Sequence, residues 1–307
     1  MGPTATGKTA LAVELVQRLP LAIVSVDSAL VYRGMDIGTA KPCPAVLKKA
    51  PHQLVDIRDP RESFSVGEFY EAASSAIEAI LSENKIPLLV GGTMLYFYAL
   101  QQGIAPLPKA NPVIRKQLQN TLERSGLSYL HDQLRQRDPV SAQRIHVNDP
   151  QRLLRALEVI EITGQTLSSL QANTAPSTRY RFINISILPS NRNELQQRLA
   201  QRFHDMLAQG LVEEVRALYS RGDLHAELPA LRSVGYRQVG QYLSGTLTYQ
   251  AMHERAIIAT RQLAKRQMTW LRSWKVTQTL NMEDDTNLKQ LMALGQLLVD
   301  SFAKEST

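Results

Sequence analysis

MGPTATGKT, residues 1–9, is the stretch of this 307-residue chain that decides the fold. Gly2, Gly7, Lys8 and Thr9 fit the pattern G-x-x-x-x-G-K-[ST] of a phosphate-binding loop without a mismatch. In such a loop the backbone N–H groups at a helix N-terminus surround a phosphate, the lysine reaches the outer phosphates, and the Ser/Thr hydroxyl can bind Mg²⁺. The sequence therefore predicts a phosphate site that consists of Gly2, Pro3, Thr4, Ala5, Thr6, Gly7, Lys8 and Thr9, with Thr9 as the metal ligand.

A phosphate loop normally leaves the end of a buried parallel strand, but only Met1 stands in front of Gly2. An empty strand position in a parallel sheet would leave buried backbone groups unpaired. We therefore expect the natural product to begin further upstream, with a short apolar strand. The alternative is that a neighbouring segment or a rearranged sheet fills the position.

Strands and helices alternate after the loop. Residues 10–19 have apolar side chains at helical spacing, and a second helix is expected around residues 66–83. LAIVSVDS (residues 21–28) and IPLLVGGT (residues 86–93) are typical of buried parallel strands. The fold class is thus α/β, a P-loop NTPase-like parallel sheet flanked by helices, with ligands at the carboxyl ends of the strands.

The composition changes after PLPKANP (residues 106–112), a segment with three prolines. The following polar, helical stretch predicts a small helical insertion at residues 109–147, between the first part of the core (1–108) and the second part (148–307). Asp149, Pro150 and Gly164 predict the cap, first turn and end of a helix. RFINISIL (residues 181–188) predicts a further strand, and the chain beyond residue 193 is expected to be mostly helical.

Composition limits the class of protein. No apolar stretch is long enough to span a bilayer, no signal peptide is present, and the single Cys43 has no partner for an internal disulfide. We therefore expect a cytoplasmic monomer without a membrane partner. The net charge of +7 suits a polyanionic partner, and residues 261–275 carry five basic residues and no acidic one. The alternative for that segment is a solvated helix face.

The phosphate loop does not by itself identify the ligand. The Asn-Lys-x-Asp element of switch GTPases is missing, and the strand IPLLV ends in Gly91 and Gly92 where an ATPase would have a metal-binding acid. Two hypotheses remain: an enzyme that uses a diphosphate substrate, or a nucleotide-dependent nucleic-acid-binding protein without transfer chemistry.

Seven segments together resemble one family, the tRNA dimethylallyltransferases or isopentenyl-tRNA transferases, in a bacterial form. They are GPTATGKT (2–9), VDSALVYRGMDIGTAKP (26–42), PHQLVDI (51–57), PLLVGGTMLY (87–96), NDPQRLLRALEV (148–159), RSVGYRQ (232–238) and TRQLAKRQMTWLR (260–272). The resemblance implies transfer of a dimethylallyl group from dimethylallyl diphosphate to the exocyclic amino nitrogen of the adenosine 3′-adjacent to the anticodon, with release of diphosphate.

The resemblance also implies catalytic roles for Asp27, Thr93 and Arg202. Asp27 would accept the amine proton as a general base, with a helix cap or Mg²⁺ ligand as the alternative. Arg202 would bind diphosphate, or else be an ordinary surface arginine. Thr93 would contact the diphosphate or the base, or cap a helix. Neutralising the leaving diphosphate should dominate the rate, since an allylic diphosphate then ionises readily.

The tRNA anticodon stem-loop is the expected partner, and an unpaired base of its loop must be splayed out to react. The residues expected to contact tRNA are Asp27, Ser28, Ala29, Leu30, Arg115, Gln151, Arg152, Leu153, Leu154, Arg155, Arg232, Ser233, Val234, Gly235, Tyr236, Arg237, Lys265, Arg266, Gln267, Met268, Thr269, Trp270, Leu271 and Arg272. For Arg115, a role unrelated to substrate is an equal alternative.

Overall fold

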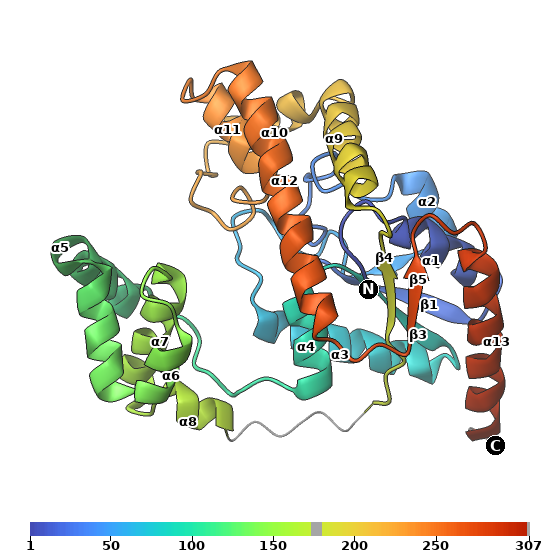
Figure 1. Cartoon of the computed structure of the whole chain (residues 1–307), viewed down its shortest axis with the longest axis horizontal. Helices are drawn as coiled ribbons and strands as arrows, with labels where there is room; N and C mark the ends of the chain where they lie inside the picture. The colour runs from blue at the N-terminus through green and yellow to red at the C-terminus, as the bar shows by residue number, and fades with distance from the viewer. Residues whose placement is uncertain (173–179, 306–307) are drawn as a thin grey trace. The chain divides into compact units, whose positions relative to one another are not determined.

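The computed structural model describes residues 1–172 and 180–305. The chain forms two compact units, which we describe separately: Met1–Ala99 together with Arg181–Thr307, and Leu100–Tyr180 (Figure 1). The expected insertion, residues 109–147, lies within the second unit. That unit also contains the helix that begins at Pro150, because Leu153 and Leu157 of this helix pack in one apolar cluster with Leu130 and Leu134.

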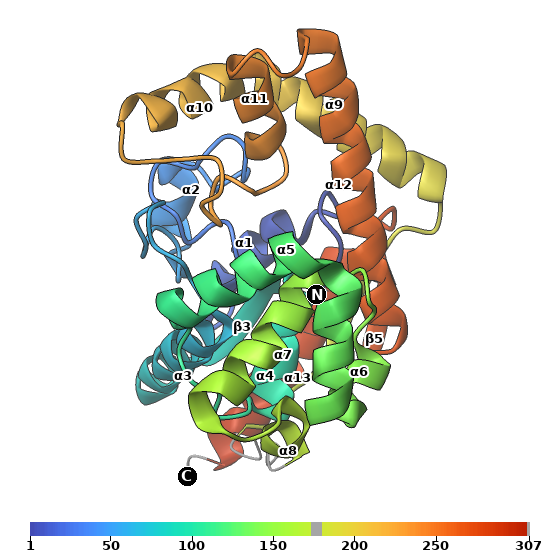
Figure 2. The same ribbon diagram turned by 90° about the vertical axis from the view of Figure 1, so that its left-hand side faces the viewer.

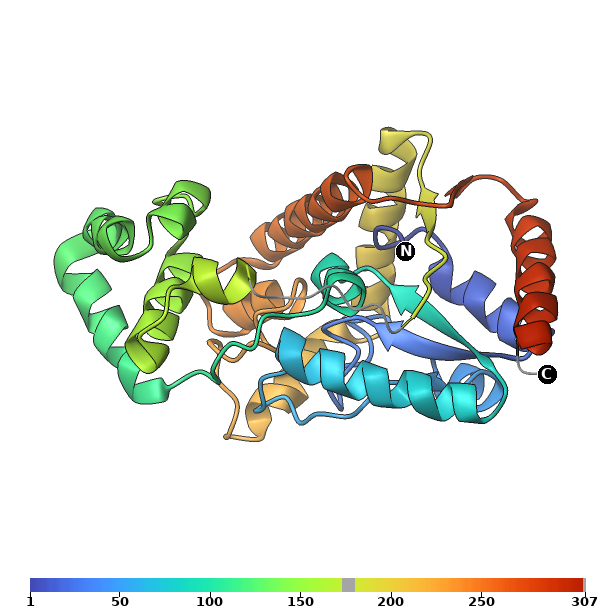
Figure 3. The same cartoon turned by 90° about the horizontal axis from the view of Figure 1, so that it is seen from below.

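Three parallel strands form the first sheet, in the order β2-β1-β3. Their bounds are Leu21–Val26 for β1, His52–Gln53 for β2 and Ile86–Gly91 for β3. Helices α1 (Lys8–Val16) and α3 (Val66–Ser82) both pack on β1 and β3, and Figure 3 shows α3 along the lower side of these strands. The helices and strands expected over residues 10–93 are therefore confirmed, as is the α/β class.

A second, two-stranded parallel sheet pairs β4 (Ile185–Leu188) with β5 (Gln278–Asn281). The expected strand at residues 181–188 is thus shorter than predicted. The Met1 amino nitrogen donates to Ile185 O at 2.7 Å, and Ile187 N donates to Met1 O at 2.9 Å, so Met1 pairs with β4. Within the described ranges no strand pairs with the edge of β3 that faces away from β1.

The remaining elements of the first unit are helical, as expected beyond residue 193. They are α2 (Pro44–Lys49), the start of α4 (Met94–Gln102), α9 (Arg192–Ala208), α10 (Leu211–Ser220), α11 (Tyr236–Leu243), α12 (Tyr249–Arg272) and α13 (Asn287–Glu305). Helix α11 lies between α10 and α12 and packs on both (Figure 2), while α13 packs on α1 (Figure 1).

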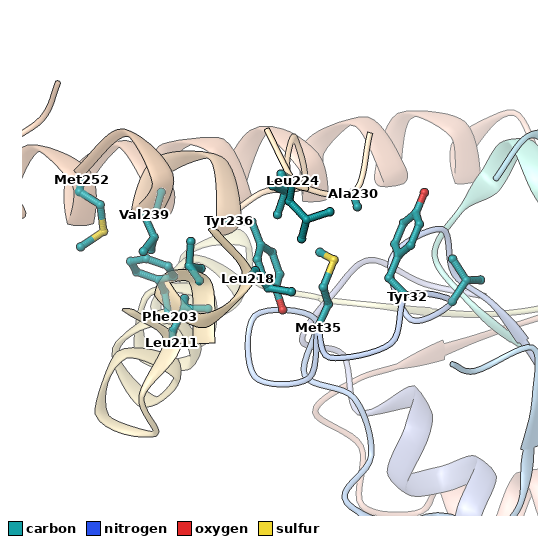
Figure 4. Close-up of a cluster of buried hydrophobic side chains, with 14 residues drawn as sticks. Tyr32, Met35, Phe203, Leu211, Leu218, Leu224, Ala230, Tyr236, Val239 and Met252 are labelled. Atoms are coloured by element: carbon teal, nitrogen blue, oxygen red, sulfur yellow. The ribbon is translucent and has the colours of Figure 1, made fainter. Parts of the chain in front are cut away.

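A large apolar cluster joins these helices to the loop that follows β1. Figure 4 shows Met35 and Tyr32 of that loop together with Tyr236 of α11 and Leu218 of α10. All four side chains are buried. The cluster therefore fixes the segment that carries Asp27 against helices from the last third of the chain.

The second unit consists of α5 (Pro112–Arg137), α6 (Pro139–Arg144), α7 (Pro150–Thr163) and α8 (Leu167–Ala172). The predicted cap of α7 is confirmed: the Asp149 side chain accepts from Arg152 N, and Gly164 ends the helix with a φ of 69°. No helix within the described ranges combines the length and the apolar character that crossing a bilayer requires.

Candidate active site

The phosphate loop runs from Met1 directly into α1. Gly7, the residue before the helix, has a φ of 77°, and Thr6 Oγ1 donates to Pro3 O at 2.9 Å. A side chain at Gly2 would place its Cβ 2.6 Å from Ile187 O, so this position requires glycine. No side chain caps α1, and the N–H groups of its first turn are therefore available to an anionic ligand.

Lys8 is a buried cation without a carboxylate partner among the described residues. Its Nζ donates to Pro3 O at 2.5 Å. Burial lowers the pKa of Lys8 to about 8; the charge of Asp27 acts in the opposite direction, and that of Arg202 lowers the pKa further. A bound anion would compensate this buried charge.

Arg202 supplies a second cation at the same place. It projects from α9, it is largely buried, and burial lowers the pKa of its guanidinium while the charge of Asp27 raises it. Within residues 1–172 and 180–305 no carboxylate lies within ion-pair distance of it. Lys8 and Arg202 line one cavity of about 140 Å³, together with Asp27 and the glycines at the end of β3. A cavity thus lies at the carboxyl ends of the strands, where the sequence predicts ligands.

Asp27 follows β1 and uses its two carboxylate oxygens differently. Oδ1 accepts from Ala29 N at 2.8 Å and from Leu30 N at 3.3 Å, which caps the turn after the strand. Oδ2 has no hydrogen-bond partner among the described residues. Asp27 thus caps a turn and not the start of a helix, because the next helix begins only at Pro44, and one oxygen stays free to accept a proton or contact a cation.

Thr93 holds the Asp27 turn instead of lining the cavity. Its Oγ1 accepts from Ser28 N at 3.0 Å and donates to Ser28 Oγ at 3.4 Å. Thr93 does not belong to the residues that line the cavity. The geometry supports a positioning role for Thr93, through Ser28, more than contact with diphosphate.

Gln267 of α12 connects the loop to the first sheet. Its Oε1 accepts from Thr4 N at 3.0 Å, and its Nε2 donates to Gly92 O at 2.9 Å. Sequence reasoning placed Gln267 among the residues that contact tRNA. Its amide is occupied by these two backbone groups, so its role in this structure is to position the phosphate loop.

Two polar side chains of the cavity were missed by the sequence analysis. Ser25 Oγ and His52 Nε2 are buried and have no hydrogen-bond partner, and both residues line the cavity. His52 Nδ1 lies 2.7 Å from Ala50 O, and burial lowers the pKa of the imidazole, so a neutral ring would present Nε2 as an acceptor. A polar residue inside the apolar run LAIVSV was the signal for Ser25.

The expected tRNA-contacting residues differ widely in exposure. The exposed ones are Ser28, Arg115, Gln151, Arg152, Arg232, Arg237, Lys265, Arg266, Thr269, Trp270 and Arg272. Those of intermediate exposure are Asp27, Ala29, Leu30, Leu154, Arg155, Ser233, Val234, Gln267 and Met268. Four are buried: Leu153, Gly235, Tyr236 and Leu271. For these four, the interpretation as RNA contacts is corrected to a role in packing, because Gly235 has no side chain and the side chains of the other three do not reach solvent.

Tyr236 illustrates that correction. Its hydroxyl donates to Glu214 Oε1 at 2.5 Å, and its ring lies so close to Gly38 that a Cβ there would be 2.5 Å away. The Glu214 carboxylate also accepts from the N–H groups of Asp36, Ile37 and Gly38 at 2.8–3.1 Å. Glu214, which sequence reasoning missed, therefore holds the loop after β1 in place.

Arg115 and Arg155 both form ion pairs with the buried Glu158 within the second unit. Each donates to Glu158 Oε2 at 2.8 Å, and Asn111 N donates to Glu158 Oε1 at 3.0 Å. Arg155 also donates to Pro108 O at 2.6 Å. The side chain of Glu158 is fully buried, so both arginines have a structural partner here.

The residues of the cavity fit a divalent metal ion. Thr9 offers a hydroxyl and Asp27 offers its free Oδ2 in the same cavity. The described ranges contain no group of three or more His, Cys, Asp or Glu that could hold a metal. This pattern is typical of Mg²⁺ sites in which one carboxylate and phosphate oxygens provide the ligands and several waters remain.

Comparisons with known proteins identify the family to which this chain is similar. The family model described as IPP transferase matches residues 30–274. A tRNA isopentenylpyrophosphate transferase of Bacillus halodurans is 34% identical, with a TM-score of 0.71, over 99% of this chain and 96% of that chain. A tRNA delta(2)-isopentenylpyrophosphate transferase of Staphylococcus epidermidis is 33% identical, with a TM-score of 0.69, over 98% of this chain and 97% of that chain.

A more distant structure shares the fold. A eukaryotic dimethylallyltransferase described as acting on tRNA is 24% identical, with a TM-score of 0.83, over 98% of this chain and 78% of that chain.

Proposed function

Because the chain belongs to the IPP transferase family, we propose that it transfers a dimethylallyl group from dimethylallyl diphosphate to tRNA. The acceptor is the exocyclic amino nitrogen of the adenosine 3′-adjacent to the anticodon, and diphosphate is released. The observation that carries this proposal is the cavity in which two buried cations, Lys8 and Arg202, lie with the free carboxylate oxygen of Asp27.

The two cations and the loop N–H groups stabilise the leaving diphosphate. Ionisation of the allylic C–O bond leaves a negative charge on diphosphate, and fixed donors in a buried site stabilise that charge without reorganisation. A bound Mg²⁺ would add positive charge at the diphosphate, with Thr9 as its protein ligand. Arg202 and Lys8 remain charged at neutral pH and hold the diphosphate oxygens.

Asp27 acts as the base for the adenine amine, which is the nucleophile. The adenine amine is a weak nucleophile that must lose one proton as its nitrogen bonds to the allylic carbon. Asp27 Oδ2 accepts that proton, while Oδ1 keeps the carboxylate oriented through Ala29 N and Leu30 N. Thr93 fastens the same turn through Ser28 and is a positioning residue.

The exposed basic residues bind the phosphates of the RNA. Lys265, Arg266 and Arg272 lie on the late part of α12, which also positions the phosphate loop through Gln267. Phosphate contacts of this kind orient RNA without reading its sequence. We expect a monomeric, cytoplasmic enzyme.

The test is incubation of the chain with unmodified tRNA, dimethylallyl diphosphate and Mg²⁺, followed by mass analysis of the nucleosides. A dimethylallylated adenosine at the position next to the anticodon is the expected product. The alternative, a nucleotide-dependent RNA-binding protein without transfer activity, gains no support from the comparisons. It predicts tRNA-stimulated ATP hydrolysis and no alkylated nucleoside, which would overturn the proposal.

A further inference from the structure

The first unit contains a second cavity, separate from the phosphate site. It has a volume of about 530 Å³ and lies between α10, α11 and residues 221–235. A cavity of this size is in the range of sites that bind small organic groups. None of the residues that line it also lines the phosphate cavity.

Six polar side chains line this second cavity, and five of them lack partners in the described chain; the exception is Ser244, whose Oγ donates to Gln241 O. Arg232 and Arg237 bring positive charge, Glu227 brings a carboxylate, and Gln241 and Tyr219 bring an amide and a phenol. No side-chain hydrogen bond or ion pair joins any of the five to another part of the chain that the structure describes. By contrast, nearby Arg221 is bonded to both Asp59 and Asp223, at 3.0–3.1 Å.

Tyr219 is held at the cavity by a close contact with Gly240. A Cβ at Gly240 would lie 2.6 Å from the Tyr219 hydroxyl and 3.1 Å from its ring. The glycine therefore allows the edge of the aromatic ring to lie against α11. This arrangement leaves an aromatic side chain, free hydrogen-bonding groups and two cations around one volume.

We propose that this cavity binds one unpaired nucleotide of the RNA substrate, distinct from the adenosine that reacts. An extruded base offers an apolar body and hydrogen-bonding edges, which suit Tyr219, Gln241 and Glu227, and its phosphates suit Arg232 and Arg237. A large apolar molecule would leave these charged groups buried without partners. The proposal rests on the proposed function, because it takes tRNA as the partner.

The test uses anticodon stem-loop RNAs in which each loop nucleotide in turn is replaced by an abasic residue. Their affinities are measured for the full chain and for Gln241→Ala, Tyr219→Phe and Arg237→Ala. Lys289→Ala, on α13 at a distant part of the same unit, is the matched surface control (Figure 1). Melting temperatures of all variants establish that they are folded.

We expect one abasic position, other than the acceptor adenosine, to weaken binding about tenfold in the unchanged chain. At that position the abasic residue should cost little more in Gln241→Ala or Arg237→Ala, because the partners are already lost. Tyr219→Phe should weaken binding less than Gln241→Ala, and Lys289→Ala should leave the pattern unchanged.

Equal abasic effects in the unchanged chain and in all three cavity variants would overturn the proposal. So would tight binding of free nucleoside monophosphates without any such coupling, because the cavity would then be a small-molecule site. These readouts are separate from transfer activity. If the cavity variants change the abasic effect but no alkylated nucleoside forms, the proposed function alone is refuted. If alkylated nucleoside forms but the variants leave the abasic effect unchanged, the nucleotide cavity alone is refuted.

Discussion

The two units differ in whether their buried charged groups have partners of opposite charge. In the phosphate cavity of the first unit, Lys8 and Arg202 are buried and have no carboxylate at ion-pair distance among the described residues. In the second unit, the fully buried Glu158 is bonded to two arginines and a backbone N–H. Burial would raise the pKa of Glu158, but the bonds from Arg155 and Asn111 N and the charge of Arg115 hold it below its ordinary value. In this protein the paired charges stabilise the fold, whereas the cations without a carboxylate partner indicate where a ligand binds.

The largest effect is expected for Asp27→Asn, which removes the proton-accepting oxygen and keeps an acceptor for Ala29 N and Leu30 N. Transfer should fall by about 10² to 10⁴-fold, the contribution of a general base, while tRNA affinity changes by less than about threefold. Single-turnover transfer and RNA titration measure the two quantities. Near-normal turnover at saturating substrates would show that Asp27 is not the base.

On the paired side of the comparison, Glu158→Gln should destabilise the chain. The free energy of unfolding should drop by about 3 kcal/mol, at the low end for a broken buried pair, because Arg115 and Arg155 reach solvent. Glu161→Gln, which removes the exposed partner of Arg137, is the control and should cost less than about 1 kcal/mol. Urea unfolding followed by circular dichroism compares them, and equal losses would contradict the structural role of the Glu158 cluster.

On the unpaired side, Lys8→Met should weaken binding of inorganic diphosphate, and the weakening should depend on pH. The pKa of Lys8 in the free protein is about 8, and bound diphosphate raises it, so binding takes up a proton above pH 8. The affinity advantage of the unchanged chain over Lys8→Met should therefore be full below pH 8 and shrink by up to about tenfold per pH unit above it. Calorimetry in the presence of Mg²⁺ measures both proteins in the same buffers, which cancels the titration of diphosphate itself. A constant advantage from pH 7 to pH 10 would contradict the low pKa.

The smallest effect concerns the salt dependence of tRNA binding. Arg272→Ala removes an exposed cation without a partner in the described chain, so the slope of log affinity against log salt should decrease by about one. Arg155→Ala removes a cation that Glu158 already neutralises, and its slope should change less. If Arg155→Ala and Arg272→Ala lower the slope equally, pairing with Glu158 does not withdraw Arg155 from RNA.

Sequence patterns predicted the structural elements whose formation depends on neighbouring residues. The phosphate loop, the strand that ends at Asp27 and the capped helix that begins at Pro150 are each encoded within a few positions. Strand β5 was missed because its four residues, QTLN, carry no apolar alternation of their own and are a strand only beside β4. A local sequence pattern is enough to predict a feature whose geometry depends only on neighbouring residues.

Side-chain pairings between distant segments could not be predicted in this way. Glu158 has the spacing of an ordinary residue of an amphipathic helix. Arg155 lies three positions before it on the same helix, but its second partner, Arg115, becomes apparent only once α5 packs on α7. Tyr236 was interpreted as part of an RNA-binding turn, although it packs on Gly38 and bonds to Glu214. Gln267 stood among exposed basic residues, which concealed its bonds to Thr4 and Gly92.

The bonds of Gln267 also bear on the order in which the protein folds. The residues that define the phosphate loop and the Asp27 turn belong to the first hundred, but Gln267 is 263 positions from Thr4, and Glu214 is 176 positions from Gly38. Contacts of such sequence separation form late, because a long chain must first be brought together. During synthesis the phosphate loop therefore emerges long before α12 can secure it. Catalytic competence would then arise only when nearly the whole chain has left the ribosome, whatever the stability of the earlier sheet.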